Sequence, residues 1–125
     1  MNRGRVRIRV GVAVVATIAV GMVGRSLPWV GNALGGIAYT VLIALLIALV
    51  WPAVRPVVAA SVATGASVAV ELLQLTPIPR TLVGAAPALR WVFGSTFAWE
   101  DMLWYAAGGL VAFGVVALIR AALTP

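Results

Sequence analysis

The stretch that decides the fold runs from Pro56 to Leu75 and reads PVVAASVATGASVAVELLQL. It carries one charged side chain, Glu71, which is also the only acidic residue among the first 99 positions. At about 1.5 Å per residue, a helix of this length crosses the hydrocarbon core of a bilayer. A carboxylate at mid-membrane costs roughly 2.5–3.5 kcal/mol, so it usually has a partner and often a function. The run therefore predicts a spanning helix and marks Glu71 for attention.

The composition of the whole chain predicts that it lies in lipid. Of 125 residues, 63% are hydrophobic and only 10% are charged, whereas soluble domains are about 25% charged. The chain has no cysteine, histidine or lysine, which removes thiolate chemistry and most metal and haem sites, so we predict no metal and no cofactor. The net charge of +6 comes from arginines that punctuate apolar runs. Because they do not gather on one polar face, we predict no nucleic-acid partner.

Four apolar segments predict four spanning helices, at about 6–23, 34–51, 56–75 and 102–120. Each has close to the roughly 17–25 residues that a spanning helix needs, and in lipid a helix satisfies its own backbone whereas an open strand cannot. We therefore predict an all-α fold, an integral membrane four-helix bundle forming one transmembrane domain over residues 1–125. A signal peptide is the alternative for the first segment, but no small-x-small site followed by a polar region appears, so we retain it as a helix.

The arginines predict the orientation of this bundle, because cytoplasmic loops carry an excess of positive charge. Six would share the side of the two termini, and three would lie on the other side. A lysine-free chain rich in Ala, Val and Arg is typical of a bacterial genome of high GC content. We therefore predict a multi-pass protein of the bacterial cytoplasmic (inner) membrane with both termini inside. The two groups are Arg3, Arg5, Arg7, Arg9, Arg55 and Arg120, against Arg25, Arg80 and Arg90.

The connection over residues 76–101 is too long for a simple turn and too apolar for a solvated loop. Its middle, from Arg80 to Phe97, is expected to form a short interfacial or re-entrant helix. We expect breaks near Pro87 and Gly94. Long connections with apolar content of their own tend to be functional, so this outer loop belongs to the candidate site.

Polar residues in the third segment recur at spacings of three, four and three, which places them on one helical face. The neighbouring face carries a row of small residues, which permits close helix contact. We therefore predict that this helix is central, with its polar stripe pointing inward. The polar stripe is Thr64, Ser67, Glu71 and Gln74, and the small row is Ser61, Gly65 and Ala69.

In the fourth segment, Asp101, Tyr105 and Gly108 share a face at i, i+4 and i+7. The alternative role of Asp101 is a helix cap, because orphan N–H groups and the dipole favour an acid at a helix N-terminus. Glu100 is expected to be a solvated rim charge. The predicted topology brings the polar ends of the segments to one membrane face. The candidate ligand-binding residues are Glu71, Gln74, Arg80, Arg90, Asp101, Tyr105 and Asn32.

The order of these motifs resembles a known family pattern. The chain has Glu71-x-x-Gln74, a loop with proline and arginine, and then Phe97-x-Trp99-x-Asp101-x-x-x-Tyr105-x-x-Gly108. This pattern is similar to a small bacterial membrane family of unknown function, which is in turn similar to the VanZ-like proteins. The resemblance implies a four-helix membrane protein. It also implies an accessory role, because VanZ-like proteins are associated with glycopeptide-antibiotic resistance.

Two positions depart from the VanZ-like pattern and weaken the transfer of a VanZ-specific role. Tyr105 stands where VanZ-like proteins carry asparagine, and Asn32 stands where related chains often carry aspartate.

The favoured hypothesis is an outward-facing polar pocket that binds a lipid headgroup or a lipid-linked cell-envelope ligand, with membrane lipids as partners. Arginine would meet phosphate or carboxylate, and the acids would orient amines or hydroxyls. One alternative is an intramembrane enzyme in which Glu71 and Asp101 act as an acid–base pair, but no nucleophile supports it, so we lean against an enzyme. Another is a small transporter, which would need a homo-oligomer. The last is a purely structural bundle in which Glu71 pairs with Arg80 or Arg90.

Overall fold

A computed structural model describes residues 2–28, 30–90 and 99–123, whose regular elements are helices. Four of the helices are long and apolar enough to cross a membrane, so the all-α, multi-pass architecture is confirmed at that level. The bounds of these four differ from the expected ones by no more than three residues. The elements are α1 (Arg3–Arg25), α2 (Gly31–Val50), α3 (Pro56–Leu73), α4 (Ile78–Ala85), the short 3-10 helix η1 (Pro87–Leu89) and α6 (Glu100–Leu123).

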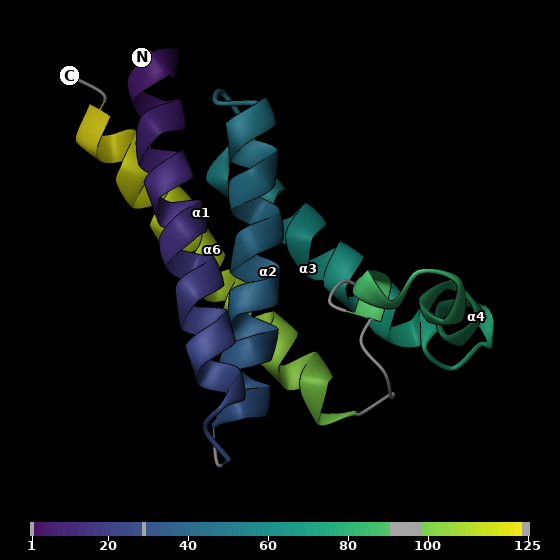
Figure 1. The fold of residues 1–125 in the computed structure, drawn as a ribbon. Coiled ribbons are helices and arrows are strands. Elements are labelled where there is room, and N and C mark those ends of the chain that lie inside the picture. Colours follow the sequence, from purple (N-terminus) through teal and green to yellow (C-terminus); the bar gives the residue numbers. More distant parts are fainter. Residues whose placement is uncertain (1, 29, 91–98, 124–125) are drawn as a thin grey trace.

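The four long helices form a bundle with both termini at the same end, from which α3 diverges toward α4 (Figure 1). Helix α2 packs against α1, α6 and α3, whereas α3 packs against α6 and α2. The prediction that α3 is central is therefore wrong, and α2 holds the centre. The reason is that α2 is the most apolar of the four long helices and buries small residues such as Ala38, Ala44 and Ala48, which permit close helix contact.

The row of small residues on α3 does not form the helix contact that the sequence predicts. Ser61, Gly65 and Ala69 are exposed, and nothing lies within 4 Å of a Cβ built on Gly65. The buried face of α3 instead carries Ala59, Ala60, Ala63, Ser67 and Glu71. Burying the polar stripe keeps the carboxylate of Glu71 and the hydroxyl of Ser67 off the exposed surface of the helix. As a result, the row of small residues faces outward.

The buried interior has an apolar half and a polar half. The apolar half lies at the end that carries the termini, and the polar half begins at Thr40 and Ser67 and reaches Glu71 and Tyr105. The polar residues therefore lie on helices whose other ends pack together in the apolar half, and not on loops. The apolar half consists of Val6, Val10, Val41, Ala44, Leu45, Ala48, Val54, Ala59, Ala60, Ala63, Ala112 and Val116.

Helices α2 and α6 approach each other closely in the polar half. A Cβ built on Gly108 would lie 3.0 Å from the backbone oxygen of Ile37 and 2.9 Å from the Cβ of Thr40. A Cβ on Gly36 would lie 2.8 Å from the Cβ of Trp104. Glycine at both positions lets the two backbones meet, which brings the start of α6 against the first half of α2.

The segment after α3 contains short helices. Helix α4 ends at Ala85 and η1 begins at Pro87, so the break expected near Pro87 is confirmed. The break expected near Gly94 lies outside the described residues. Helix α4 contacts η1, and its side chains are mostly exposed apart from Pro79. Whether this segment lies at the interface or re-enters the membrane stays a prediction.

Candidate functional site

Glu71 lies in the last turn of α3, at the end far from Pro56, and its side chain is 1% exposed. Ser67, one turn earlier, is fully buried, while Thr64 and Gln74 are half-buried. The prediction that the polar stripe points inward is therefore confirmed. Because Glu71 is near a helix end, its carboxylate lies toward one boundary of the apolar span rather than at its centre, where the cost is greatest.

The hydroxyl of Tyr105 on α6 donates a 2.8 Å hydrogen bond to Oε2 of Glu71. Tyr105 is 8% exposed, and its ring lies 6.2 Å from that of Tyr39 on α2, with the two planes tilted by 49°. Tyr105 thus links α6 to α3 through a hydrogen bond and to α2 through a ring contact. Tyr105 and Glu71, which the sequence places in the same candidate site, are joined directly by a hydrogen bond between α6 and α3.

Two further acids lie in the first turn of α6. Asp101 is half-buried, and its carboxyl group interacts electrostatically with Glu71 and with Glu100. Glu100 is exposed, as expected, and its Oε1 accepts a long 3.5 Å hydrogen bond from Nδ2 of Asn32. We call Glu71, Glu100 and Asp101 the carboxyl cluster. Interacting carboxyl groups favour a hydrogen-bond donor or a shared proton, whereas the described part of the chain has no group of three acids arranged to hold a metal ion.

A buried pair of hydroxyl groups lies between the carboxyl cluster and the apolar half. Ser67 Oγ donates to the Ala63 carbonyl at 2.9 Å, and Thr40 Oγ1 lies 2.9 Å from Ser67 Oγ. Because the single hydroxyl proton of Ser67 goes to Ala63, Thr40 is the donor to Ser67. The pair joins α2 to α3 one helical turn before Glu71, and so helps to hold the carboxylate in place.

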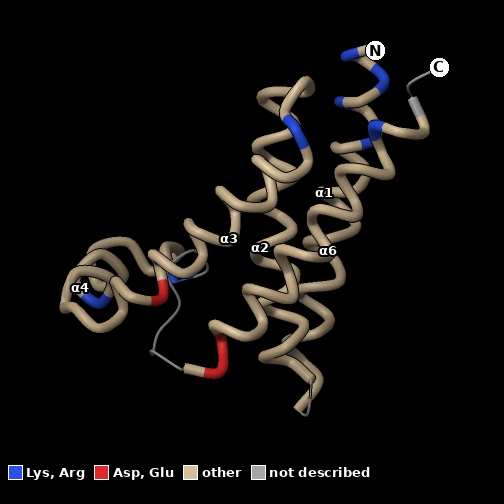
Figure 2. Tube along the Cα trace, turned by 180° about the vertical axis from the view of Figure 1, so that it is seen from behind, with Lys and Arg blue, Asp and Glu red and all other residues tan. Residues whose placement is uncertain are grey.

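The predicted arginines lie at the same end of the molecule but on its surface. Arg80 is exposed on α4, and Arg90 is exposed directly after η1. Figure 2 shows acidic positions at the end of α3 and the start of α6, with a basic position on the neighbouring α4. Gln74 follows α3 as its cap and donates its backbone N–H to the Glu71 carbonyl at 3.1 Å. The carboxyl group of Glu71 accepts a hydrogen bond from the buried Tyr105, whereas Arg80 and Arg90 are exposed residues.

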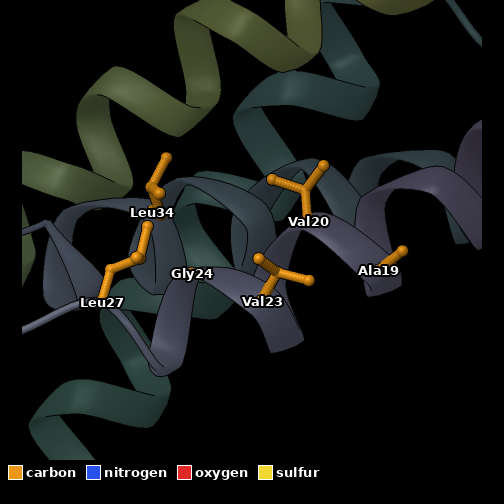
Figure 3. A pocket seen from close by; sticks show the side chains of 6 residues that line it. All are labelled: Ala19, Val20, Val23, Gly24, Leu27 and Leu34. Atoms are coloured by element: carbon orange, nitrogen blue, oxygen red, sulfur yellow. The ribbon is translucent and has the colours of Figure 1, made fainter.

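An apolar hollow of about 290 Å³ lies between the end of α1 and the start of α2 (Figure 3). No residue of the predicted polar site lines it, so it is not the polar pocket that the sequence predicts. Its side chains suit a hydrocarbon group rather than a charged one. The hollow is lined by Ala19, Val20, Val23, Gly24, Leu27 and Leu34.

Sequence reasoning missed two residues of α2, Tyr39 and Thr40. Tyr39 packs beside the Tyr105 ring, and Thr40 is fully buried against Ser67. A signal was present, because these are the only polar side chains between Ala33 and Val50. Adjacent polar residues in an otherwise apolar helix indicate its bundle-facing side.

The fold and the acidic site around the buried Glu71 define a class: multi-pass helical membrane proteins with an acidic polar site near one end of the bundle. Over residues 26–109 the chain matches the family described as "Protein of unknown function (DUF2809)". This match covers more than half of the chain, and the chain belongs to this family. No curated protein and no solved structure matches it.

The matched region includes most of the candidate site, because it contains α2, α3, α4 and the first part of α6. Glu71, Asp101 and Tyr105 all fall within it, whereas α1 precedes it. The resemblance to VanZ-like proteins stays a prediction.

Proposed function

We propose that this protein is a multi-pass protein of the bacterial inner membrane that binds the polar headgroup of a lipid or lipid-linked envelope ligand at its outer face. Both termini are cytoplasmic in this proposal. The observation that carries it is the buried hydrogen bond from Tyr105 to Glu71, with Asp101 beside it. A tyrosine that fixes a carboxylate next to other acids keeps an acceptor in place for an incoming donor.

The chemistry of the site favours a zwitterionic headgroup, such as phosphoethanolamine. An amine would meet the carboxyl cluster, and a phosphate would meet the exposed guanidinium groups of Arg80 and Arg90. Tyr105 would orient Glu71, and Asn32 would position Glu100. The apolar hollow beside the start of α2 offers room for part of an acyl chain, which favours a lipid over a soluble amine.

A purely structural role for Glu71 fits these residues less well. The hydrogen bond that the buried carboxyl group accepts from Tyr105 joins α3 to α6 without an ion pair, while Arg80 and Arg90 are exposed residues outside these two helices. Three acids at one end of a small bundle repel one another, which lowers stability unless a cation or proton offsets them. A loss of stability of this kind is expected at positions where residues are selected for binding rather than for folding.

The test measures lipid retained by the full-length protein in neutral detergent, using native mass spectrometry after exchange with phosphatidylethanolamine or with phosphatidylcholine, whose quaternary ammonium has no N–H to donate. We expect preferential retention of phosphatidylethanolamine. The Glu71→Gln variant should weaken it at least about tenfold, because a hydrogen bond to a charged group contributes roughly 1.5–3 kcal/mol. Ser61→Ala, at an exposed position of the same helix, is the matched control.

Equal retention of both lipids, with no effect of either Glu71→Gln or Asp101→Asn, would reject the proposal. The second variant guards against loss of folding in the first. A second candidate function, acid–base catalysis on a lipid-linked substrate, is favoured by the direct interaction of Glu71 with Asp101. Product formation in the same samples, lost in both variants, would select it instead.

An accessory role in the cell envelope, as the VanZ-like resemblance implies, extends this proposal to the cell. Deletion of the gene should then change sensitivity to glycopeptide antibiotics, and complementation with Glu71→Gln should fail to restore it. Unchanged sensitivity on deletion would remove the accessory role and leave the binding proposal to its own test.

A further inference from the structure

Six arginines gather at the end of the molecule that carries both termini. The three acidic residues of the chain lie in the last turn of α3 and the first turn of α6, at the opposite end. Figure 2 shows the separation between the basic and acidic ends. The positive charge at this end therefore has no acidic side chain of the chain beside it. The six are Arg3, Arg5, Arg7, Arg9, Arg55 and Arg120.

Three of these arginines, from three parts of the chain, lie around the end of α2 and the turn at residues 51–54. Arg7 on α1 donates through Nε to the Leu49 carbonyl at 3.1 Å. Arg120 on α6 donates through Nη1 to the Val54 carbonyl at 2.9 Å. Arg55 directly follows the turn and is exposed. We call Arg7, Arg55 and Arg120 the turn site.

The residues next to the turn site in the chain pack into the apolar core. Val6, next to Arg7, and Val54, next to Arg55, are both buried. The Leu49 carbonyl belongs to the last turn of α2, where the helix dipole favours a cation and the carbonyls lack helical partners. The hydrogen bond therefore orders the Arg7 side chain in advance, which reduces the entropy lost when an anion binds.

We propose that the turn site binds the phosphodiester headgroup of an anionic phospholipid in the leaflet on that side. The planar fork of a guanidinium matches phosphate geometry. Two of these arginines are hydrogen-bonded to carbonyls only five residues apart, Leu49 and Val54, and Arg55 directly follows the second. Exposed apolar side chains flank the turn: Trp51 is 54% exposed, and Val50 and Val57 are exposed as well. These give the acyl chains a surface directly beside the charged headgroup.

The experiment uses the delipidated full-length protein in neutral detergent, titrated with short-chain phosphatidylglycerol, phosphatidylcholine or inorganic phosphate. We expect phosphatidylglycerol to bind at least tenfold more tightly than phosphatidylcholine and to weaken as ionic strength rises. Inorganic phosphate at equal concentration should leave phosphatidylglycerol binding unchanged. Comparable affinity for the two lipids, or full competition by inorganic phosphate, would overturn the proposal.

Two variants that each remove one positive charge distinguish binding at the turn site from general attraction by the positive charge at this end of the molecule. Arg55→Gln, at an exposed turn-site position, should weaken phosphatidylglycerol binding about fivefold, as expected for one arginine at an anionic surface. Arg3→Gln, one helical turn before Arg7, should change it less than about twofold, because α1 places Arg3 farther from the turn. If Arg3→Gln weakens binding as much as Arg55→Gln, the attraction is general and the turn site is rejected.

Discussion

Single residues show how this chain tolerates a carboxylate inside an apolar helix. Glu71 lies near the end of its span, which lowers the cost of its burial. It also accepts a hydrogen bond from Tyr105 and lies beside Asp101. The hydrogen bond from Tyr105 supports the buried position of the carboxyl group, and the charge of the neighbouring acid opposes it.

The first prediction concerns the energy of that contact. Tyr105→Phe removes the hydroxyl that reaches Glu71 and should lower the free energy of unfolding in detergent by about 0.6–3 kcal/mol. A double-mutant cycle with Glu71→Gln supplies the control, because the loss should be smaller when the charged acceptor is absent. If the two changes are additive, the hydroxyl and the carboxyl group are not coupled.

The second prediction concerns Gly108. Gly108→Ala places a methyl group 3.0 Å from the backbone oxygen of Ile37, and backbone cannot move aside cheaply, so we expect a loss of about 1–3 kcal/mol. Gly114→Ala on the same helix is the control, because nothing lies within 4 Å of its Cβ. Thermal unfolding in detergent measures both. Equal unfolding temperatures would contradict the close approach of α2 and α6.

At the scale of elements, the orientation of α3 decides what the site contains. The sequence offers two faces for packing, a polar stripe and a row of small residues. Helix α3 buries the stripe, with Ser67 against Thr40 and Glu71 against Tyr105. The small row then remains exposed because one helix cannot turn both faces toward the same two neighbours.

The third prediction follows from this orientation. Ser67→Ala breaks the buried hydroxyl pair between α2 and α3 and leaves Thr40 without that acceptor, so it should destabilise the protein by about 0.6–2 kcal/mol. Ser61→Ala changes the same atoms at an exposed position and should leave stability within about 0.5 kcal/mol. The two unfolding temperatures give the comparison, and equal losses would indicate that both faces are buried.

Element boundaries were predictable only approximately from the pattern of apolar residues. The segment expected at 6–23 begins three residues earlier because the Asn2 side chain accepts a 3.1 Å hydrogen bond from the Arg5 backbone and caps α1. The segment expected at 102–120 begins at Glu100. This shift places Glu100 and Asp101 inside the first turn of α6, where acids are favoured by the helix dipole.

At the scale of the whole molecule, charge divides the bundle into a basic end and an acidic end. The basic end carries both termini, and the acidic end carries the candidate site (Figure 2). Such a division orients a multi-pass protein, because positive segments stay on the cytoplasmic side.

The fourth prediction tests this orientation. The chain has no cysteine, so maleimide labelling of a variant reports on its single introduced cysteine. Ala85→Cys on α4 should react with a membrane-impermeant maleimide on intact cells, whereas Ala121→Cys near the end of α6 should react only after permeabilisation. Both alanines are exposed, which makes the pair a matched comparison. The reverse pattern would invert the orientation and place the candidate site on the cytoplasmic side.

Length, hydropathy and helical period were enough to predict a membrane setting, four spanning helices and the inward direction of Glu71. The central helix and the contacts of the carboxyl group, in contrast, depend on how the helices pack. Tyr105 reaches Glu71 from 34 positions away, and Thr40 reaches Ser67 from 27 positions away. Such pairings depend on which faces of the helices pack together, and periodicity within one helix cannot choose among faces that suit packing equally well.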